Sequence, residues 1–242
     1  MGWTVIIPTM WRSPLTVPLL KSLTESLFVN EVIIIDNSPA DRPQFQLPKV
    51  KILEQVENIY VNPAWNLGVR NAQHELICLC NDDVAFNPSI FNAAEEYLND
   101  STVVGCHEDN FQLKNVHIPT IHPGHAIGQG WGCVLFLHKK GFIPIPASLK
   151  IWCGDDWLVI THSHTKRIKF PVNTAMSTTS GSPGLNVIAQ KDKQTFHDVT
   201  TENARIQLAL LHFSNGAKDS LFRRVLFKIG SSFRWNLINR HL

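Results

Sequence analysis

The chain has 242 residues, of which 44% are hydrophobic and 17% charged, enough apolar material to bury the core of one large domain. Its 22 basic and 20 acidic residues leave a formal net charge of +2. Because nucleic-acid-binding proteins carry a marked basic excess, no nucleic-acid partner is expected. No apolar run approaches the length that spans a bilayer, and the residues before Pro8 do not resemble a signal peptide. The five cysteines lack zinc-binding or redox spacing and favour reduced thiols in the cytoplasm.

Short β-branched or apolar runs predict four buried strands early in the chain, over 3–7, 31–36, 50–53 and 76–80. A helix is expected after Ser13 and Pro14, where five leucines recur at helical spacing: Leu15, Leu19, Leu20, Leu23 and Leu27. Two more helices are expected over 63–73 and 88–98, each beginning with a proline. This alternation predicts an α/β fold with a mostly parallel, doubly wound sheet.

The second half of the chain is less regular. Strands are expected over 131–137 and 167–170, with an aromatic-rich segment over 152–162 between them and a loop over 174–184. We expect one domain over 1–215, with a nucleotide-binding half (1–100) and an acceptor half (101–215). Residues 216–242 alternate apolar and basic side chains and predict an amphipathic helix. That helix either lies on an anionic membrane or packs on the domain.

Polar residues follow three of the predicted strands: Thr9, Asp36, and the cluster Asn81, Asp82 and Asp83. Parallel sheets bind ligands at the carboxyl ends of their strands, so these residues are expected along one rim. Turn chemistry alone is an alternative explanation, because Asn and Asp are common where strands turn. Carboxylates at a rim also suit Mg²⁺ or Mn²⁺, which prefer oxygen ligands and bridge carboxylates to a diphosphate.

The region around this cluster resembles the inverting glycosyltransferase family 2, whose members have the GT-A fold. The residues at matching spacings are Asn66, Gly68, Ala72, Glu75, Ile77 and Asp83. Three positions depart from the pattern: Trp65 stands where Arg is common, His74 where Gly is common, and Asn81 where the motif has its first Asp. The segments 6–9 and 33–38 are similar to the opening strands of the family, which contact the nucleotide.

The resemblance implies a role for each of these residues. Asp83 is expected to bind the divalent metal, and Asp36 to approach the nucleobase. The other residues expected at the nucleotide-sugar donor are Pro8, Thr9, Asn66 and Asp82. A late histidine often adds a metal or phosphate contact in the family, and His162, His164 and His197 are candidates beside a purely structural role.

A second acidic pair, Asp155 and Asp156, resembles the Glu-Asp motif of the family, and its alignment makes Asp156 the catalytic base and Asp155 its partner. Inverting transfer needs a base that takes the proton of the acceptor hydroxyl. An adjacent carboxylate and burial are expected to raise the pKa of Asp156. As an alternative, the pair caps a helix. Aromatic rings stack on sugars, so Trp131, Trp152 and Trp157 are candidates for acceptor binding, with core packing as the alternative.

Together these features predict a metal-dependent inverting glycosyltransferase that moves a sugar from a nucleotide-sugar, in the first place a UDP-sugar, to a glycan or lipid-linked hydroxyl. Mn²⁺ or Mg²⁺ is the expected cofactor, and the inner face of a membrane is the expected place of peripheral contact. An inactive nucleotide- or glycan-binding module is one alternative. A nucleotidyltransferase is another, although Pro8 to Arg12 lack the glycines of a phosphate loop.

Overall fold

The computed structural model describes residues 2–113, 120–123, 131–175 and 183–202. Its strands are β1 (Trp3–Thr9), β2 (Val29–Asp36), β3 (Val50–Glu54), β4 (Leu76–Cys80), β5 (Val84–Phe86), β6 (Thr102–Cys106), β7 (Thr120–Pro123), β8 (Val134–His138), β9 (His164–Lys169) and β10 (Val172–Thr174). Its α-helices are α1 (Thr16–Glu25), α2 (Val61–Asn71), α3 (Ile90–Glu95), α4 (Gly154–Thr161) and α5 (Pro183–Glu202).

The main sheet has eight strands among the described residues, in the order β3-β2-β1-β4-β8-β6-β9-β7. The four predicted strands β3, β2, β1 and β4 are parallel neighbours, as expected. Beyond them β8 runs antiparallel to both β4 and β6, and β7 runs antiparallel to β9. The fold is therefore the predicted α/β arrangement with a mostly parallel sheet, in which the antiparallel strands β8 and β7 belong to the acceptor half. Strands β5 and β10 form a separate two-stranded antiparallel sheet.

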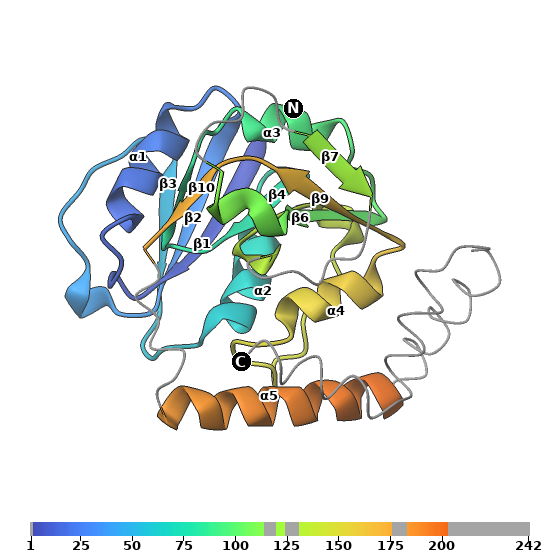
Figure 1. Cartoon of the computed structure of the whole chain (residues 1–242). Helices are drawn as coiled ribbons and strands as arrows, with labels where there is room; N and C mark the ends of the chain where they lie inside the picture. Colours follow the sequence, from blue (N-terminus) through green and yellow to red (C-terminus); the bar gives the residue numbers. More distant parts are fainter. Residues whose placement is uncertain (1, 114–119, 124–130, 176–182, 203–242) are drawn as a thin grey trace.

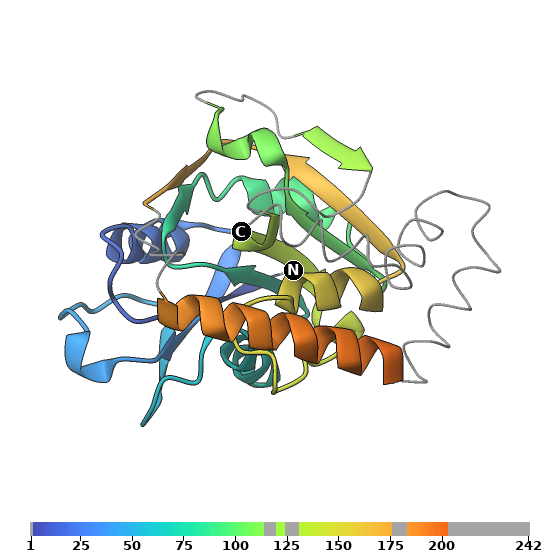
Figure 2. The same cartoon turned by 60° about the horizontal axis from the view of Figure 1, so that its bottom comes forward.

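Helices cover both faces of the sheet (Figure 1). Alternate side chains of β1 point to opposite faces: Val5 and Ile7 pack with leucines of α1 and with Phe91 of α3, whereas Ile6 packs against α2. The second core also receives side chains from α4 and α5. Both views show α5 close to α4 and to one end of α2 (Figures 1 and 2). Sheet strands buried on both faces explain why β1 and β4 read as continuous apolar runs.

The three predicted helices are present with other boundaries: α2 spans Val61–Asn71 rather than 63–73, and α3 spans Ile90–Glu95 rather than 88–98. Helix α1 begins at Thr16 rather than at Pro14, because the Ser13 hydroxyl accepts a hydrogen bond from the Leu15 amide and forms a turn first. Pro18 then falls in the first helical turn, where its missing N–H costs nothing. The helix ends at Glu25, so Leu27 lies beyond it and is 95% exposed, contrary to its assignment to the apolar stripe.

Several elements of the second half were not predicted. Strand β6 and helix α5 had no counterpart in the sequence analysis, and the expected strand 131–137 begins as a 3-10 turn, Trp131–Cys133, before β8. Most of the loop expected over 174–184, and the whole amphipathic helix expected over 216–242, lie outside the described residues. None of the helices within the described ranges is long and apolar enough to cross a membrane.

Candidate active site

The rim predicted from the strand ends is present. Thr9 and Asp36 end β1 and β2 and lie opposite each other in the parallel register. Asp82 follows β4, and its carboxylate accepts a hydrogen bond of 2.6 Å from the Thr9 hydroxyl. The Thr16 hydroxyl, in the first turn of α1, also donates to the Asp82 carbonyl. Pro8, within buried β1, supports this rim from the core.

Asp82 and Asp83 lie next to each other where β4 ends, and burial raises the pKa of both carboxyls. The Thr9 hydrogen bond opposes the rise at Asp82, and the negative charge of Asp83 adds to it. Asp83 is only 9% exposed. A cation beside this pair would offset the cost of burying two negative charges.

The Asp36 carboxylate is fully buried and already has partners. It accepts hydrogen bonds from the Trp11 indole N–H at 2.8 Å and from the Ser38 amide at 3.0 Å. Arg42 lies 3.3 Å from its second oxygen and also pairs with Glu54. A nucleobase that used Asp36 would therefore have to displace Trp11 or Arg42.

Asn66 has a different place from the one expected. Its amide nitrogen donates to the Ile145 carbonyl at 2.7 Å, and its amide oxygen accepts the Ile145 N–H at 2.9 Å. Because both polar atoms of this buried side chain are satisfied by one backbone unit, Asn66 holds the loop that precedes α4. In this structure Asn66 therefore stabilises a loop of the site, and its side chain is not free to bind the donor.

The second acidic pair occupies the first turn of α4. The Asp156 amide donates to the Asp155 carboxylate at 3.0 Å. The N-cap residue is Cys153, which makes no side-chain capping hydrogen bond, so of the capping alternative only the placement of both acids in the first turn is confirmed. Burial, followed by the charge of Asp156, raises the pKa of Asp155 to about 7. The raised pKa expected for Asp156 stays a prediction. Cys153, just before the helix, has a left-handed backbone with φ of 62°.

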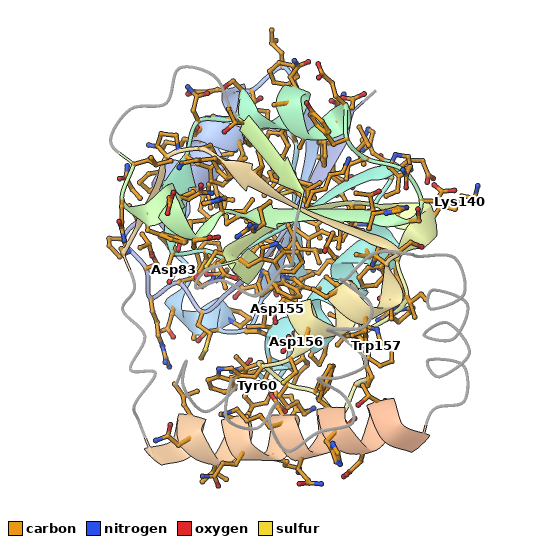
Figure 3. The ribbon with its side chains drawn as sticks, turned by 45° about the vertical axis from the view of Figure 1, so that its right-hand side comes forward. Tyr60, Asp83, Lys140, Asp155, Asp156 and Trp157 are labelled. Carbon is orange, nitrogen blue, oxygen red and sulfur yellow. The ribbon has the colours of Figure 1, made fainter. Side chains whose placement is uncertain are left out.

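The 3-10 turn before β8 lies between the two acidic pairs. The Asn81 amide donates to the Cys133 carbonyl at 2.9 Å, which joins this turn to the end of β4. A Cβ atom added to Gly132 would lie 2.8 Å from Oδ2 of Asp155. Burial raises the pKa of the Cys133 thiol to about 12, and the charges of both Asp83 and Asp155 contribute. Figure 3 shows Asp83, Asp155 and Asp156 in succession from the end of β4 to the start of α4.

Gly132 and Cys133 were noted in the sequence only as part of an acceptor-side strand. Their role as the junction between Asp83 and Asp155 depends on the antiparallel pairing of β8 with β4, in which Val134 lies opposite Cys80. The sequence signal that could have located them is a glycine immediately before a buried strand, a position that allows close approach.

A family model for glycosyl transferase family 2 matches residues 4–139, more than half of the chain. The chain belongs to glycosyl transferase family 2. The predicted enzyme class is thereby confirmed, and this member of glycosyl transferase family 2 contains both acidic pairs named above, although the matched region ends before Asp155. No curated protein matched the chain.

Solved structures place this family 2 chain among proteins with the GT-A fold. The crystal structure of S. aureus TarS 1-349 has a TM-score of 0.56 at 14% identity, over 95% of this chain and 69% of that one. The same fragment in complex with UDP-GlcNAc gives 0.57 at 12% identity, over 97% and 72% of the two chains. GalNAc-T7 with UDP, GalNAc and Mn²⁺ gives 0.54 at 11% identity, over 78% and 48%. At such identities the likeness concerns the fold.

Two of the three tryptophans proposed to bind the acceptor are core residues of this glycosyltransferase. Trp131 is 1% exposed and packs against Gly105 of β6, where any side chain would collide with the indole. Trp157 is 4% exposed and donates to the Ile143 carbonyl at 3.2 Å. Trp152 is half-buried and lies directly before the acidic turn of α4. Of the three, only Trp152 has a partly accessible side chain.

The late histidines lie at the end of α4, at the start of β9 and on α5. His162 is buried at the carboxyl end of α4, where its Nδ1 donates to the Leu158 carbonyl at 2.8 Å and burial lowers its pKa. The helix rises about 1.5 Å per residue, so its length separates His162 from Asp155 by about 10 Å. His164 begins β9 and His197 lies exposed on α5. Among the described residues, no group of three or more His, Cys, Asp or Glu side chains is arranged to hold a metal ion.

Proposed function

We propose that this glycosyltransferase moves a sugar, with inversion, from a UDP-sugar to a hydroxyl of a glycan or lipid-linked acceptor. The observation that carries the proposal is that two acidic pairs approach each other on either side of Gly132 and Cys133. One pair ends a strand of the nucleotide half, and the other begins a helix of the acceptor half. A transfer reaction needs such an approach, because the donor and the acceptor must be held together while the bond is exchanged.

The donor is proposed to lie along the rim, with its nucleotide near Pro8, Thr9 and Asp36 and its diphosphate near Asp82 and Asp83. The solved structures support this placement by analogy of fold, since one holds UDP-GlcNAc and another UDP with GalNAc and Mn²⁺. A UDP-sugar is favoured over GDP- and dTDP-sugars for the same reason.

The donor atoms of this rim fit a hard divalent cation. Mg²⁺ and Mn²⁺ are commonly held by one or two carboxylates together with substrate phosphates. Asp83 and Asp82 are therefore enough to bind the cation without a third protein ligand. Asp83 is the proposed ligand, and the hydrogen bond from Thr9 orients Asp82 beside it. When bound, the cation supplies positive charge that stabilises the departing diphosphate.

Asp156 is proposed to take the proton of the attacking acceptor hydroxyl. Two adjacent carboxylates resist ionising together, and burial and the charge of Asp156 raise the pKa of Asp155 to about 7. Asp155 is therefore partly protonated near neutral pH, and Asp156 is proposed as the ionised partner that acts as base. The positive end of the α4 dipole faces both side chains in the first turn.

The experiment that tests the proposal is calorimetric titration with UDP, GDP and dTDP, each with Mn²⁺ and with a chelator. Binding of UDP that requires Mn²⁺ is expected. Selective binding of GDP or dTDP would correct the donor. Equal affinity with and without Mn²⁺ would remove the metal from the proposal, and no binding to any nucleotide would favour an inactive module.

A cytoplasmic location with peripheral contact to the inner face of a membrane goes with this proposal, since a lipid-linked acceptor would lie there. The amphipathic segment 216–242 that motivated it is outside the described residues, so the contact stays a prediction. Vesicle sedimentation with anionic and neutral lipids tests it: binding should require anionic lipid.

A further inference from the structure

The loop before α4 is held by a buried carboxylate from a helix far along the chain. Asp192 of α5 is fully buried. Its Oδ1 accepts the Lys150 N–H at 2.9 Å, and its Oδ2 accepts the N–H groups of Ile151 at 2.8 Å and Trp152 at 2.9 Å. A buried carboxylate is costly unless hydrogen-bonded donors surround it, and three successive backbone amides provide them.

A second helix holds the same loop from the other side. The buried Asn62 of α2 donates from its side chain to the Trp152 carbonyl at 3.1 Å, and its backbone N–H donates to the Lys150 carbonyl at 3.0 Å. Its amide oxygen packs against Gly154, where a Cβ atom would collide with it. The residues on either side of Cys153 are thus fixed by side chains of two helices.

These contacts lie directly before the acidic turn. Cys153 has a left-handed backbone that a residue with a side chain rarely adopts, and such strain persists only where the surroundings impose it. After Cys153 the chain enters α4 at once, so the direction of the 150–152 backbone sets where Asp155 and Asp156 point. Figures 1 and 2 show α5 close to α4 and to one end of α2, as this arrangement requires.

We propose that Asp192 is a positioning residue of the transfer reaction, which sets the acceptor-side acidic pair by holding the backbone of residues 150–152. This inference rests on the proposed function for its catalytic consequence. It extends the site to α5, an element that contributes nothing to the donor rim in the described contacts. Loss of the Asp192 carboxylate should therefore act on chemistry and leave nucleotide binding in place.

The test compares Asp192→Asn with Asp198→Asn, the same change on an exposed residue of the same helix. An amide at position 192 keeps one acceptor and presents an N–H₂ group to amides that need an acceptor. For Asp192→Asn, calorimetry should give an unchanged stoichiometry and Kd for UDP with Mn²⁺. Turnover of UDP-GlcNAc with water as acceptor, followed as released UDP, should fall by about 10- to 100-fold, because small displacements of reacting groups cost that much. Asp198→Asn should match the wild type.

A second readout is independent of the donor and acceptor. The pKa of Asp155, followed by ¹³C NMR of aspartate-labelled protein and assigned with Asp155→Asn, should move towards its ordinary range in Asp192→Asn, because a loosened turn is better hydrated. A residue that only stabilises the fold would lower the melting temperature and leave this pKa in place. If the wild-type protein did not turn over UDP-GlcNAc but bound UDP, the donor would carry another sugar, and absence of UDP binding would contradict the proposed function; in both cases the NMR comparison would still decide the role of Asp192.

If Asp192→Asn does not fold, Asn62→Ala serves as the second variant. It removes the hydrogen bond to Trp152 without leaving a buried charge, and it should give the same combination of retained UDP affinity and lowered turnover. The proposal is overturned if folded variants keep both wild-type turnover and the wild-type pKa of Asp155, or if UDP binding and turnover are lost in equal proportion.

Discussion

The two acidic pairs are held by different kinds of structure. Asp82 and Asp83 continue directly from β4, whose five residues are buried and pair with β1 and β8 on both sides. Asp155 and Asp156 follow an irregular stretch from 142 to 153, and polar side chains of α2 and α5 fix its backbone. The first pair thus depends on the sheet, whereas the second depends on a few buried hydrogen bonds made at a distance in sequence.

Because of this difference, substitutions at the donor rim and on the acceptor side should have different consequences. A sheet edge is rigid and remains in place when a single rim side chain changes, so the donor rim should lose only the contact that is removed. A loop held by a few buried polar groups can shift when one of them is lost. The acceptor side is therefore expected to be sensitive to residues that touch no substrate.

The largest effect is expected from Asp156→Asn. If Asp156 is the base, turnover should fall by about 100- to 10,000-fold, the usual contribution of a general base. UDP affinity should stay the same because the donor rim is intact. Steady-state turnover and calorimetry on the same preparation check this, and wild-type turnover would remove Asp156 from the role.

The next effect concerns the donor side. Asp83→Ala should weaken UDP binding in Mn²⁺ by about 10- to 100-fold, the range for losing a metal-ligand contact. With chelator present, the variant and the wild type should bind UDP alike, because the lost contact runs through the cation. Weakening of equal size with and without Mn²⁺ would assign Asp83 a direct contact to the nucleotide instead.

Two glycine substitutions should have opposite effects on stability. In Gly154→Ala the new methyl group collides with the Asn62 amide, so the free energy of unfolding should fall by about 1–3 kcal/mol. In Gly184→Ala the methyl group meets nothing within 4 Å, in the first turn of α5, and stability should rise by about 0.4–1 kcal/mol. Urea titration of both variants checks the pair. Equal stabilities would mean that α2 does not hold the turn.

The smallest effect is a pH dependence. The raised pKa of Asp155 means that the folded protein binds this proton more tightly than the unfolded chain does. The resulting stability is fully present below about pH 4, the ordinary value for aspartate, and is lost as the pH rises through about 7. Asp155→Asn removes this loss, so its melting temperature relative to wild type should increase by a few degrees from pH 5 to pH 8. If the difference in melting temperature between Asp155→Asn and the wild type were the same at both pH values, the ionisation of Asp155 would not affect stability in this range.

Sequence patterns predicted the donor side well and the acceptor side incompletely. The strands ending at Thr9, Asp36 and Cys80 were recognisable because continuous β-branched or apolar runs mark strands buried on both faces. The role of Asn66 could not be read in the same way: the amide that matches a family motif bonds the Ile145 backbone, a partner 79 residues away. Tertiary packing also decided that Trp131 and Trp157 are core residues, since an aromatic side chain suits either a core or a sugar-binding surface.

The sequence by itself determined the α/β alternation, the order of the strand ends and the identity of both acidic pairs, because periodicity and strand-end chemistry are local properties of the chain. Only the tertiary structure decided that Gly132 and Cys133 lie between the two pairs, that burial raises the pKa of Asp155 to about 7, and that Asp192 holds the backbone directly before α4. The physical reason is that burial and long-range hydrogen bonds arise from residues distant in sequence, and no local pattern records which of them meet.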